Sequence, residues 1–134
     1  MTQDALSGLA DVRTERMGRM GRIILDRPKR LNALDAGMAQ AIARVLDAWE
    51  HDDGVAVVLL ESSSPRAFCA GGDLRAIREA LLAHGPDSTF TLMDAAYTTM
   101  LRLADYPKPV VSFLDGIVMG GGVGIGCHVS HRVV

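Results

Sequence analysis

Hydrophobic residues follow strand-like patterns in four segments of the chain. Val12 to Arg16 and Arg22 to Leu25 are predicted to be two strands of a hairpin, joined by a glycine-containing turn. Val55 to Leu60 and Val110 to Leu114 are continuous apolar runs, which are typical of strands covered on both faces. The pattern therefore predicts a sheet that includes a hairpin and at least two buried strands.

Segments with helical spacing lie between these strands. A helix is predicted from Asp35, a suitable N-cap, to His51. Its apolar residues recur on one face: Met38, Ile42, Val45, Leu46 and Trp49. A second helix is predicted over Leu74 to Ala83 and a third over Ser88 to Ala104. On the third helix we expect one face to pack in the core: Phe90, Met93, Tyr97, Met100 and Leu101.

Strands that alternate with helices predict an α/β fold. The length of 134 residues is that of about one typical domain, and 49% hydrophobic with 22% charged residues fits a folded chain. A net charge of -2 argues against a nucleic-acid-binding surface. No apolar run approaches the ~20 residues that cross a bilayer, and no secretory signal opens the chain. We expect a soluble cytoplasmic protein that binds neither nucleic acid nor membrane.

Basic residues are concentrated near the start of the chain. Seven of the 14 lie between Arg13 and Arg30. They can be the solvated face of the hairpin, or the rim of a site for a phosphate-bearing ligand. Arg27 and Lys29, on either side of Pro28, are the best candidates for the second role.

Glycines are concentrated between Gly120 and Gly126, which contains five of the chain's 14. Close packing of a helix against a strand would explain one or two of them. The spacing matches neither the G-x-G-x-x-G nor the Walker A nucleotide motif. What remains is a strand, a glycine turn and a helix start, which together leave backbone N–H groups free.

The segment from Cys69 to Asp73 repeats this arrangement. It follows a buried strand, has small residues at Ala70, Gly71 and Gly72, and begins a helix at Asp73, which we interpret as the N-cap. Two such turns could place one N–H group each on a single carbonyl oxygen. The sequence therefore predicts an oxyanion hole.

Side chains that could act as nucleophile, base or metal ligand are not evident. No serine lies in a G-x-S-x-G motif, and Cys69 and Cys127 are expected to be inert core residues. The histidines lack metal-binding spacing, and His128 and His131 would point to opposite faces of a strand. We expect no metal and no separate cofactor.

Three blocks, in this order, resemble the crotonase (enoyl-CoA hydratase/isomerase) superfamily: 27–34 (RPKRLNAL), 67–74 (AFCAGGDL) and 108–122 (KPVVSFLDGIVMGGG). The resemblance covers nearly the whole chain from about Val12. Residues 68–73 and 119–124, followed by His128 and 131–133, resemble the branch that hydrolyses 3-hydroxyisobutyryl-CoA. The resemblance implies a crotonase-like spiral of ββα units.

The resemblance also implies a site for an acyl-CoA thioester, with coenzyme A as part of the substrate. The thioester carbonyl would lie between the N–H groups of Gly72 and Gly121. The Ala70 carbonyl would contact the adenine, and the region of Arg27 and Lys29 would line the CoA entrance. The remaining residues implied at the site are Gly71, Asp73 and Gly120.

Two positions depart from patterns of the superfamily. Its hydratases carry a catalytic glutamate two residues after the glycine triplet, and this chain has Gly124 there, as the hydrolase branch does. Its hydrolases carry an acidic residue just before the tyrosine of the third predicted helix, whereas Ala95 and Ala96 precede Tyr97 here. Asp94 is a poor substitute, because it lies about 300° around the helix from Tyr97.

The resemblance places the family's catalytic glutamate and aspartate after the strand that begins near His131, and the sequence ends at Val134. We therefore expect residues 1–134 to be the N-terminal part of a crotonase-like domain, inactive alone, with residues 1–10 a disordered lead-in. Three hypotheses stay open: a 3-hydroxyisobutyryl-CoA hydrolase, an enoyl-CoA hydratase or isomerase, and an inactive fragment that keeps part of the CoA site. A homo-oligomer is an option for a full-length protein. An exposed final strand would favour aggregation of the isolated chain.

Overall fold

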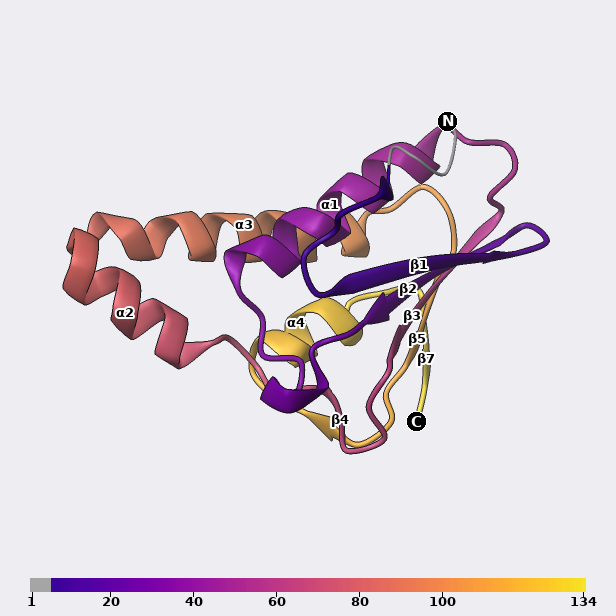
Figure 1. Ribbon diagram of the computed structural model, residues 1–134. Coiled ribbons are helices and arrows are strands. Elements are labelled where there is room, and N and C mark those ends of the chain that lie inside the picture. The colour runs from indigo at the N-terminus through magenta and orange to yellow at the C-terminus, as the bar shows by residue number, and fades with distance from the viewer. Residues whose placement is uncertain (1–5) are drawn as a thin grey trace.

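A mixed five-stranded sheet organises residues 6–134, the part of the chain that the computed structural model describes (Figure 1). Its strands lie in the order β1, β2, β3, β5, β7. Their bounds are Val12–Met17 for β1, Met20–Leu25 for β2, Val57–Ser62 for β3, Val110–Phe113 for β5 and His131–Val133 for β7. β1 and β2 form the predicted antiparallel hairpin, and the other neighbours are parallel. The predicted α/β sheet is confirmed.

Helix α1, Ala36–Glu50, connects β2 to β3 and packs on the sheet (Figure 1). Its predicted N-cap is confirmed, because the Asp35 carboxylate accepts a hydrogen bond from the Met38 N–H at 2.8 Å. All five apolar residues predicted for its inner face are buried. Trp49 packs so closely on β2 that a Cβ at Gly21 would lie 2.6 Å from its ring. A three-residue 3-10 helix, η2, Pro28–Arg30, precedes α1.

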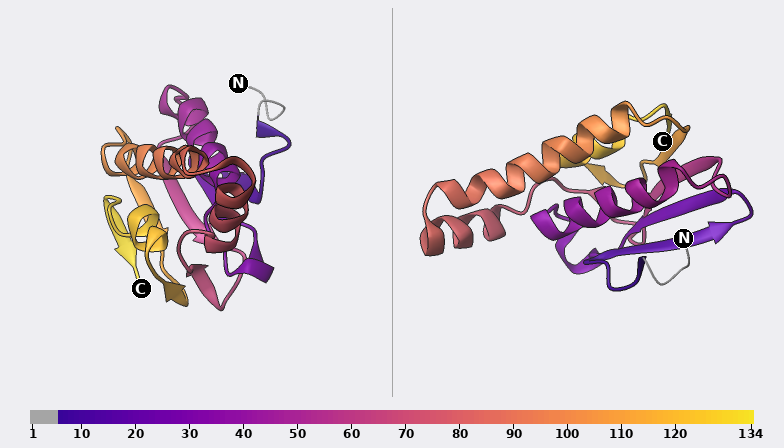
Figure 2. Two further views of the ribbon diagram at one scale, coloured as in Figure 1. Left: turned by 90° about the vertical axis from the view of Figure 1, so that its left-hand side faces the viewer. Right: turned by 90° about the horizontal axis from the view of Figure 1, so that it is seen from above.

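Helices α2, Leu74–His84, and α3, Asp87–Ala104, form an antiparallel hairpin that projects from the sheet (Figures 1 and 2). The far end of α3 returns to pack against α1. There the Thr99 hydroxyl donates a hydrogen bond to the Ala39 carbonyl at 3.1 Å. The base of the hairpin is thus anchored in the core while its tip lies away from it.

The predicted buried face of α3 is wrong for four of its five residues, and only Met100 is partly buried against the core. Phe90, Tyr97 and Leu101 are 66%, 60% and 67% exposed, and Met93 is also exposed. The buried residues of α3 are instead Leu92, Ala96, Thr99 and Leu103. These residues also recur at helical spacing, and two of them are small enough to let α3 approach α1 closely.

The predicted disordered lead-in, residues 1–10, falls only in part on residues that the structure describes. Residues 1–5 lie outside the described residues. Leu6 and Leu9, however, are partly buried and pack against the hydrophobic core. The chain is therefore packed from Leu6 onward, and the disorder expected for residues 6–10 is not what the structure shows. Among residues 6–134, no helix is long and apolar enough to span a membrane.

Candidate functional site

Two glycine-rich turns leave the same edge of a small second sheet. Its two strands, β4, Ala67–Cys69, and β6, Ile117–Val118, pair in parallel, with Cys69 opposite Val118. Carboxyl ends of parallel neighbours lie at one edge, so the turns that follow them meet. The first turn leads into α2 and the second into a short helix α4, Gly121–Gly126. The Met119 N–H donates to the Cys69 carbonyl at 3.1 Å and joins the two turns.

Gly71, Gly72, Gly120 and Gly121 form the contact between the turns. A Cβ placed on Gly121 would lie 3.5 Å from the Gly72 nitrogen, so the two backbone segments are neighbours. Gly71 and Gly120 have φ angles of +117° and +50°, which L side chains rarely adopt. Within the described residues, the N–H groups of Gly72 and Gly121 have no hydrogen-bond acceptor. The two turns therefore present two free donors side by side.

A cavity of about 220 Å³ opens beside these donors and is called the acyl cavity, after the ligand group that the sequence resemblance implies. Gly72 and Gly121 both line it. Its other walls come from residues of α2, α3 and the segment before α1: Leu34, Leu74, Ile77, Leu92, Met93, Ala96, Tyr97 and Met100. Of the described residues that line it, Tyr97 alone has a polar side chain. The site thus combines backbone donors with a mainly hydrocarbon wall, which suits an apolar acyl group.

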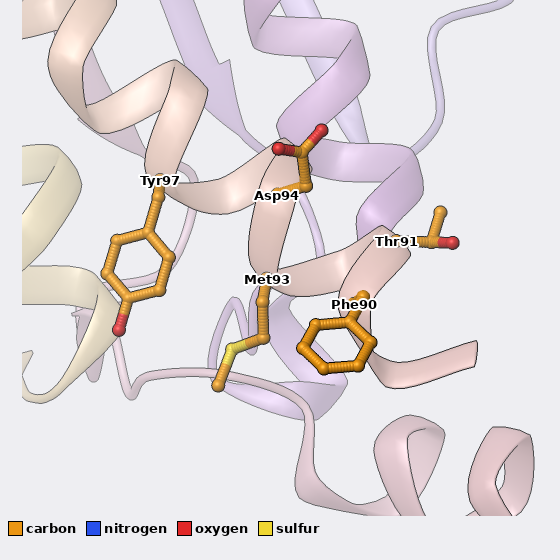
Figure 3. Close-up of a pocket in the computed structure, with 5 residues that line it drawn as sticks. All are labelled: Phe90, Thr91, Met93, Asp94 and Tyr97. Carbon is orange, nitrogen blue, oxygen red and sulfur yellow. The ribbon is translucent and has the colours of Figure 1, made fainter. Parts of the chain in front are cut away.

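Tyr97 and Met93 project from the same side of α3, together with Phe90 (Figure 3). Asp94 projects away from them (Figure 3). Asp94 does not line the acyl cavity. Asp94 and Tyr97 nevertheless line one open surface pocket, together with Phe90, Thr91 and Met93, so the expectation that Asp94 is a poor substitute for the acidic residue missing before Tyr97 stays a prediction.

Packing explains two of the other glycines of α4. A Cβ on Gly122 would overlap the Cys69 carbonyl, and one on Gly124 would overlap the Met100 sulfur. A Cβ on Gly126 would lie 2.6 Å from the Phe68 ring. Gly122 meets fixed backbone and Gly126 a buried ring, whereas the flexible Met100 side chain beside Gly124 can move. Packing therefore requires two of the five clustered glycines, in line with the one or two expected from the sequence.

Asp73 is the N-cap of α2, as predicted. Its carboxylate accepts the Ala76 N–H at 3.0 Å and pairs with the Arg27 guanidinium at 2.9 Å. Burial raises the pKa of Asp73, but the Ala76 N–H and the Arg27 charge outweigh burial and lower the pKa below its usual value. The carboxylate is therefore charged at neutral pH and fixes the end of the first glycine turn.

Arg27, predicted to line a CoA entrance, turns inward beneath this turn. Its guanidinium donates to the Ala33 carbonyl at 2.8 Å and lies 3.5 Å from both Asp11 and Asp35, in addition to its pair with Asp73. These partners give Arg27 a structural role that its position beside Pro28 did not reveal. Lys29 is exposed. It stays the better candidate for contact with phosphates.

Asn32 was missed by the sequence analysis. It is fully buried, with a φ of +54°. Its side chain accepts the Arg27 N–H at 2.8 Å and donates to the Ser62 hydroxyl at 2.7 Å and to the Phe68 carbonyl at 2.9 Å. Asn32 thereby ties the segment before α1 to β3 and β4, directly beneath the first glycine turn. The only sequence signal was its place in the block 27–34.

Cys69 is buried, as predicted. Its thiol donates to the Asn32 carbonyl at 3.1 Å, and burial raises its pKa, which disfavours the reactive thiolate. His128 and His131 are both exposed. No group of three potential metal ligands occurs among residues 6–134.

The family of this chain follows from the sequence of residues 20–134. Residues 20–134 match the model of the enoyl-CoA hydratase/isomerase family. The chain belongs to this family. The enoyl-CoA hydratase/isomerase fold expected from the three sequence blocks is also confirmed by a solved enoyl-CoA hydratase from Rhodobacter sphaeroides 2.4.1. That structure is 41% identical with a TM-score of 0.86, over 92% of this chain and 36% of the hydratase.

Relatives within the family carry different names. The mitochondrial 3-hydroxyisobutyryl-CoA hydrolase of Rattus norvegicus is 41% identical over 124 residues, which are 92% of this chain and 32% of the relative. The small ribosomal subunit protein mS47 of Neurospora crassa is 39% identical over 112 residues, 81% of this chain and 22% of the relative. The chain thus spans about a third or less of these relatives.

Proposed function

We propose that this chain carries the acyl-binding and oxyanion-stabilising part of an acyl-CoA thioester hydrolase. The proposed reaction converts 3-hydroxyisobutyryl-CoA and water to 3-hydroxyisobutyrate and coenzyme A. One observation carries the proposal: the free N–H groups of Gly72 and Gly121 lie side by side at the wall of one apolar cavity. The 41% identity to the rat hydrolase supports the choice of reaction.

The chemistry of thioester hydrolysis explains why two backbone donors matter. Water adds to the carbonyl carbon, the carbonyl oxygen takes up negative charge, and collapse of the tetrahedral adduct releases the thiol. Donors held by the fold stabilise that charge without reorganising, and each contributes about 3 kcal/mol. The ion pair of Asp73 and Arg27 and the two positive φ angles hold the turns in place for this task.

The CoA portion would extend from the cavity along the first glycine turn. The Ala70 N–H donates to the Leu31 carbonyl at 3.0 Å, which fixes this residue. Its own carbonyl has no donor in the described part of the chain, so it is free to accept a hydrogen bond from an adenine amino group. The exposed Lys29 lies on η2, which precedes the segment bonded to this turn, and offers a charge to the phosphates.

The lining of the acyl cavity supplies no carboxylate or histidine among the described residues. The chain's own share of catalysis is therefore carbonyl polarisation and acyl positioning. Proton transfer to and from water has to come from groups outside this lining. A test of the proposal should accordingly measure binding and polarisation directly.

A hydratase acting on an unsaturated acyl-CoA is the second candidate. It is favoured by the 41% identity to the Rhodobacter enoyl-CoA hydratase. Gly124 argues against a hydratase, because it occupies the position that corresponds, by the sequence resemblance, to the catalytic glutamate of hydratases. The Met100 sulfur fills the space that a side chain at position 124 would need. Loss of enoyl-CoA absorbance on addition of the protein would favour the hydratase.

A role without catalysis is the third candidate, favoured by the 39% identity to a ribosomal protein of Neurospora crassa. This candidate predicts that the glycine turns serve packing alone and bind no thioester. Binding of acyl-CoA therefore separates it from both enzyme candidates.

The deciding experiment replaces Gly121 by proline. Proline removes the N–H donor and is tolerated at the first position of a helix, where Gly121 lies. The matched control is Gly121→Ala, which keeps the donor and adds a Cβ at ordinary contact distances of 3.5 Å and more. The measurement is the infrared carbonyl band of a ¹³C-labelled 3-hydroxyisobutyryl-CoA.

We expect the band to move to lower wavenumber on binding to the natural chain and to Gly121→Ala, because the donors polarise the carbonyl. The movement should be at least halved in Gly121→Pro. Circular dichroism checks that both variants fold. An equal band position in all three proteins would contradict the oxyanion assignment.

A further inference from the structure

We propose that Ile77 and Leu92 form a wall that limits the length of the acyl group, and that a second cavity behind this wall is the path for longer chains. This inference rests on the proposed function, since it places the acyl group in the cavity beside Gly72 and Gly121. It narrows the substrate class to acyl groups short enough to end at this wall.

Two cavities meet at this wall. The acyl cavity has a volume of about 220 Å³, and the second cavity has about 270 Å³. Two described residues line both of them, Ile77 from α2 and Leu92 from α3. The two helices of the hairpin that projects from the sheet (Figure 2) therefore each contribute one side chain to the lining of both cavities.

The second cavity presents a surface suited to a hydrocarbon chain. Its walls include four residues with one side-chain carbon or none: Ala36, Gly37, Ala76 and Ala80. Asp35 and Thr91 line it as well, and the Asp35 carboxylate is already held by the Met38 N–H and the Arg27 guanidinium. Ser88 and Thr89 also line it, but their hydroxyls donate to the Gly85 and Pro86 carbonyls at 2.7 Å. Methylene groups that entered would replace water at these walls without leaving those hydroxyls unpaired.

The wall itself resists displacement. Leu92 is 8% exposed and belongs to the buried stripe of α3 that packs toward α1. Ile77 is half-buried, and its β-branched side chain has one strongly preferred rotamer in a helix. Moving either side chain aside would cost packing or rotamer energy. An unbranched acyl chain longer than the acyl cavity is therefore stopped by Ile77 and Leu92.

The test compares the binding of butyryl-CoA and octanoyl-CoA to this chain by isothermal titration calorimetry, with coenzyme A as the reference. The natural chain should bind butyryl-CoA more tightly than coenzyme A and gain less than threefold from butyryl to octanoyl. In Ile77→Ala and Leu92→Ala the wall is shortened. Since each methylene that leaves water tightens binding about fourfold, octanoyl-CoA should then bind at least tenfold more tightly than butyryl-CoA.

Three further variants isolate the wall from general effects on folding. Ile77→Val removes one methyl group with little loss of packing and should shift the preference in the same direction by a smaller factor. Adding Ala80→Leu to Ile77→Ala refills the second cavity and should abolish the gain for octanoyl-CoA. Leu81→Ala, on the same helix but lining neither cavity, should leave the octanoyl-to-butyryl ratio unchanged.

The outcomes separate the two proposals. If butyryl-CoA binds no better than coenzyme A to any of these proteins, the proposed function fails. If butyryl-CoA binds well but the octanoyl-to-butyryl ratio is the same in the natural chain, Ile77→Val and the folded alanine variants, the wall assignment fails while the proposed function stands.

Discussion

Asp73 joins the first glycine turn to α2 through one carboxylate. It caps the helix at the Ala76 N–H and pairs with Arg27, whose guanidinium also reaches Asp35, the N-cap of α1. A single arginine thus links the N-cap residues of α1 and α2. The charge on Asp73 is what makes this link.

Replacement of Asp73 by asparagine removes this charge and keeps a capping side chain. Because the folded pKa of Asp73 is lowered, its stabilisation is fully present above the unfolded value of about 3.9 and is lost as pH falls through the folded pKa. We expect Asp73→Asn to reduce the free energy of unfolding by about 1–2 kcal/mol at pH 7.

The difference between Asp73→Asn and the natural chain should shrink below about pH 4 and continue to shrink as the pH falls through the lowered folded pKa of Asp73. Urea unfolding at a series of pH values measures it. The exposed Asp94→Asn serves as control and should change stability by less than about 0.5 kcal/mol. A difference for Asp73→Asn that stayed constant from pH 7 to pH 2 would show that the charge contributes nothing.

Residue types and local spacing were enough to predict the caps and the glycine turns. Asp35 and Asp73 act on N–H groups three residues away, so the sequence contains both partners. Asn32 and Arg27 were different. The Asn32 amide bonds to Phe68, 36 residues away, and Arg27 to Asp73, so their roles emerge only when β3, β4 and the η2 segment are brought together.

At the scale of elements, α1 and α3 show when hydrophobic spacing identifies a buried face. The large apolar residues of α1 form one stripe, which is buried. Helix α3 carries two neighbouring stripes. The one with larger side chains includes Phe90 and Tyr97 and is exposed, whereas the stripe with Ala96 and Thr99 is buried against α1. Spacing alone cannot rank two stripes, because the choice depends on how closely the helices approach.

A pair of substitutions near the end of α3 measures this difference. Leu103 is 1% exposed and Leu101 is 67% exposed. Leu103→Ala leaves a cavity in the core and should lower the free energy of unfolding by about 3 kcal/mol. Leu101→Ala should change it by less than about 0.5 kcal/mol. Chemical denaturation followed by circular dichroism measures both free energies of unfolding. Equal losses for the two variants would mean that Leu101 is buried, as the sequence pattern predicted.

At the scale of the whole molecule, burial is uneven. Seven residues of α1 are buried, whereas none of the described residues of α2 is. The elements next to the glycine turns are well buried: all three residues of β4 and four residues of α4 are buried. The well-packed part of the fold thus adjoins the proposed oxyanion donors, while a marginally packed helix supplies one wall of the acyl cavity. Helical spacing alone did not predict this division, although Arg75, Arg78 and Glu79 make α2 the more polar of the two helices.

Uneven burial predicts uneven local stability, which amide hydrogen exchange with mass spectrometry can measure. Segments with few buried contacts open at a lower free energy than the core. We expect amides of α2 to exchange on the order of a hundredfold faster than those of α1 in the free chain.

Addition of butyryl-CoA should slow exchange in α2, because the acyl group contacts Ile77 in the proposed complex, and should leave exchange in α1 unchanged. Coenzyme A without an acyl group is the control and should protect α2 much less. Equal exchange rates in α1 and α2 would show that the helical hairpin and the sheet open as one cooperative unit. Equal protection by both compounds would mean that the acyl group does not contact α2.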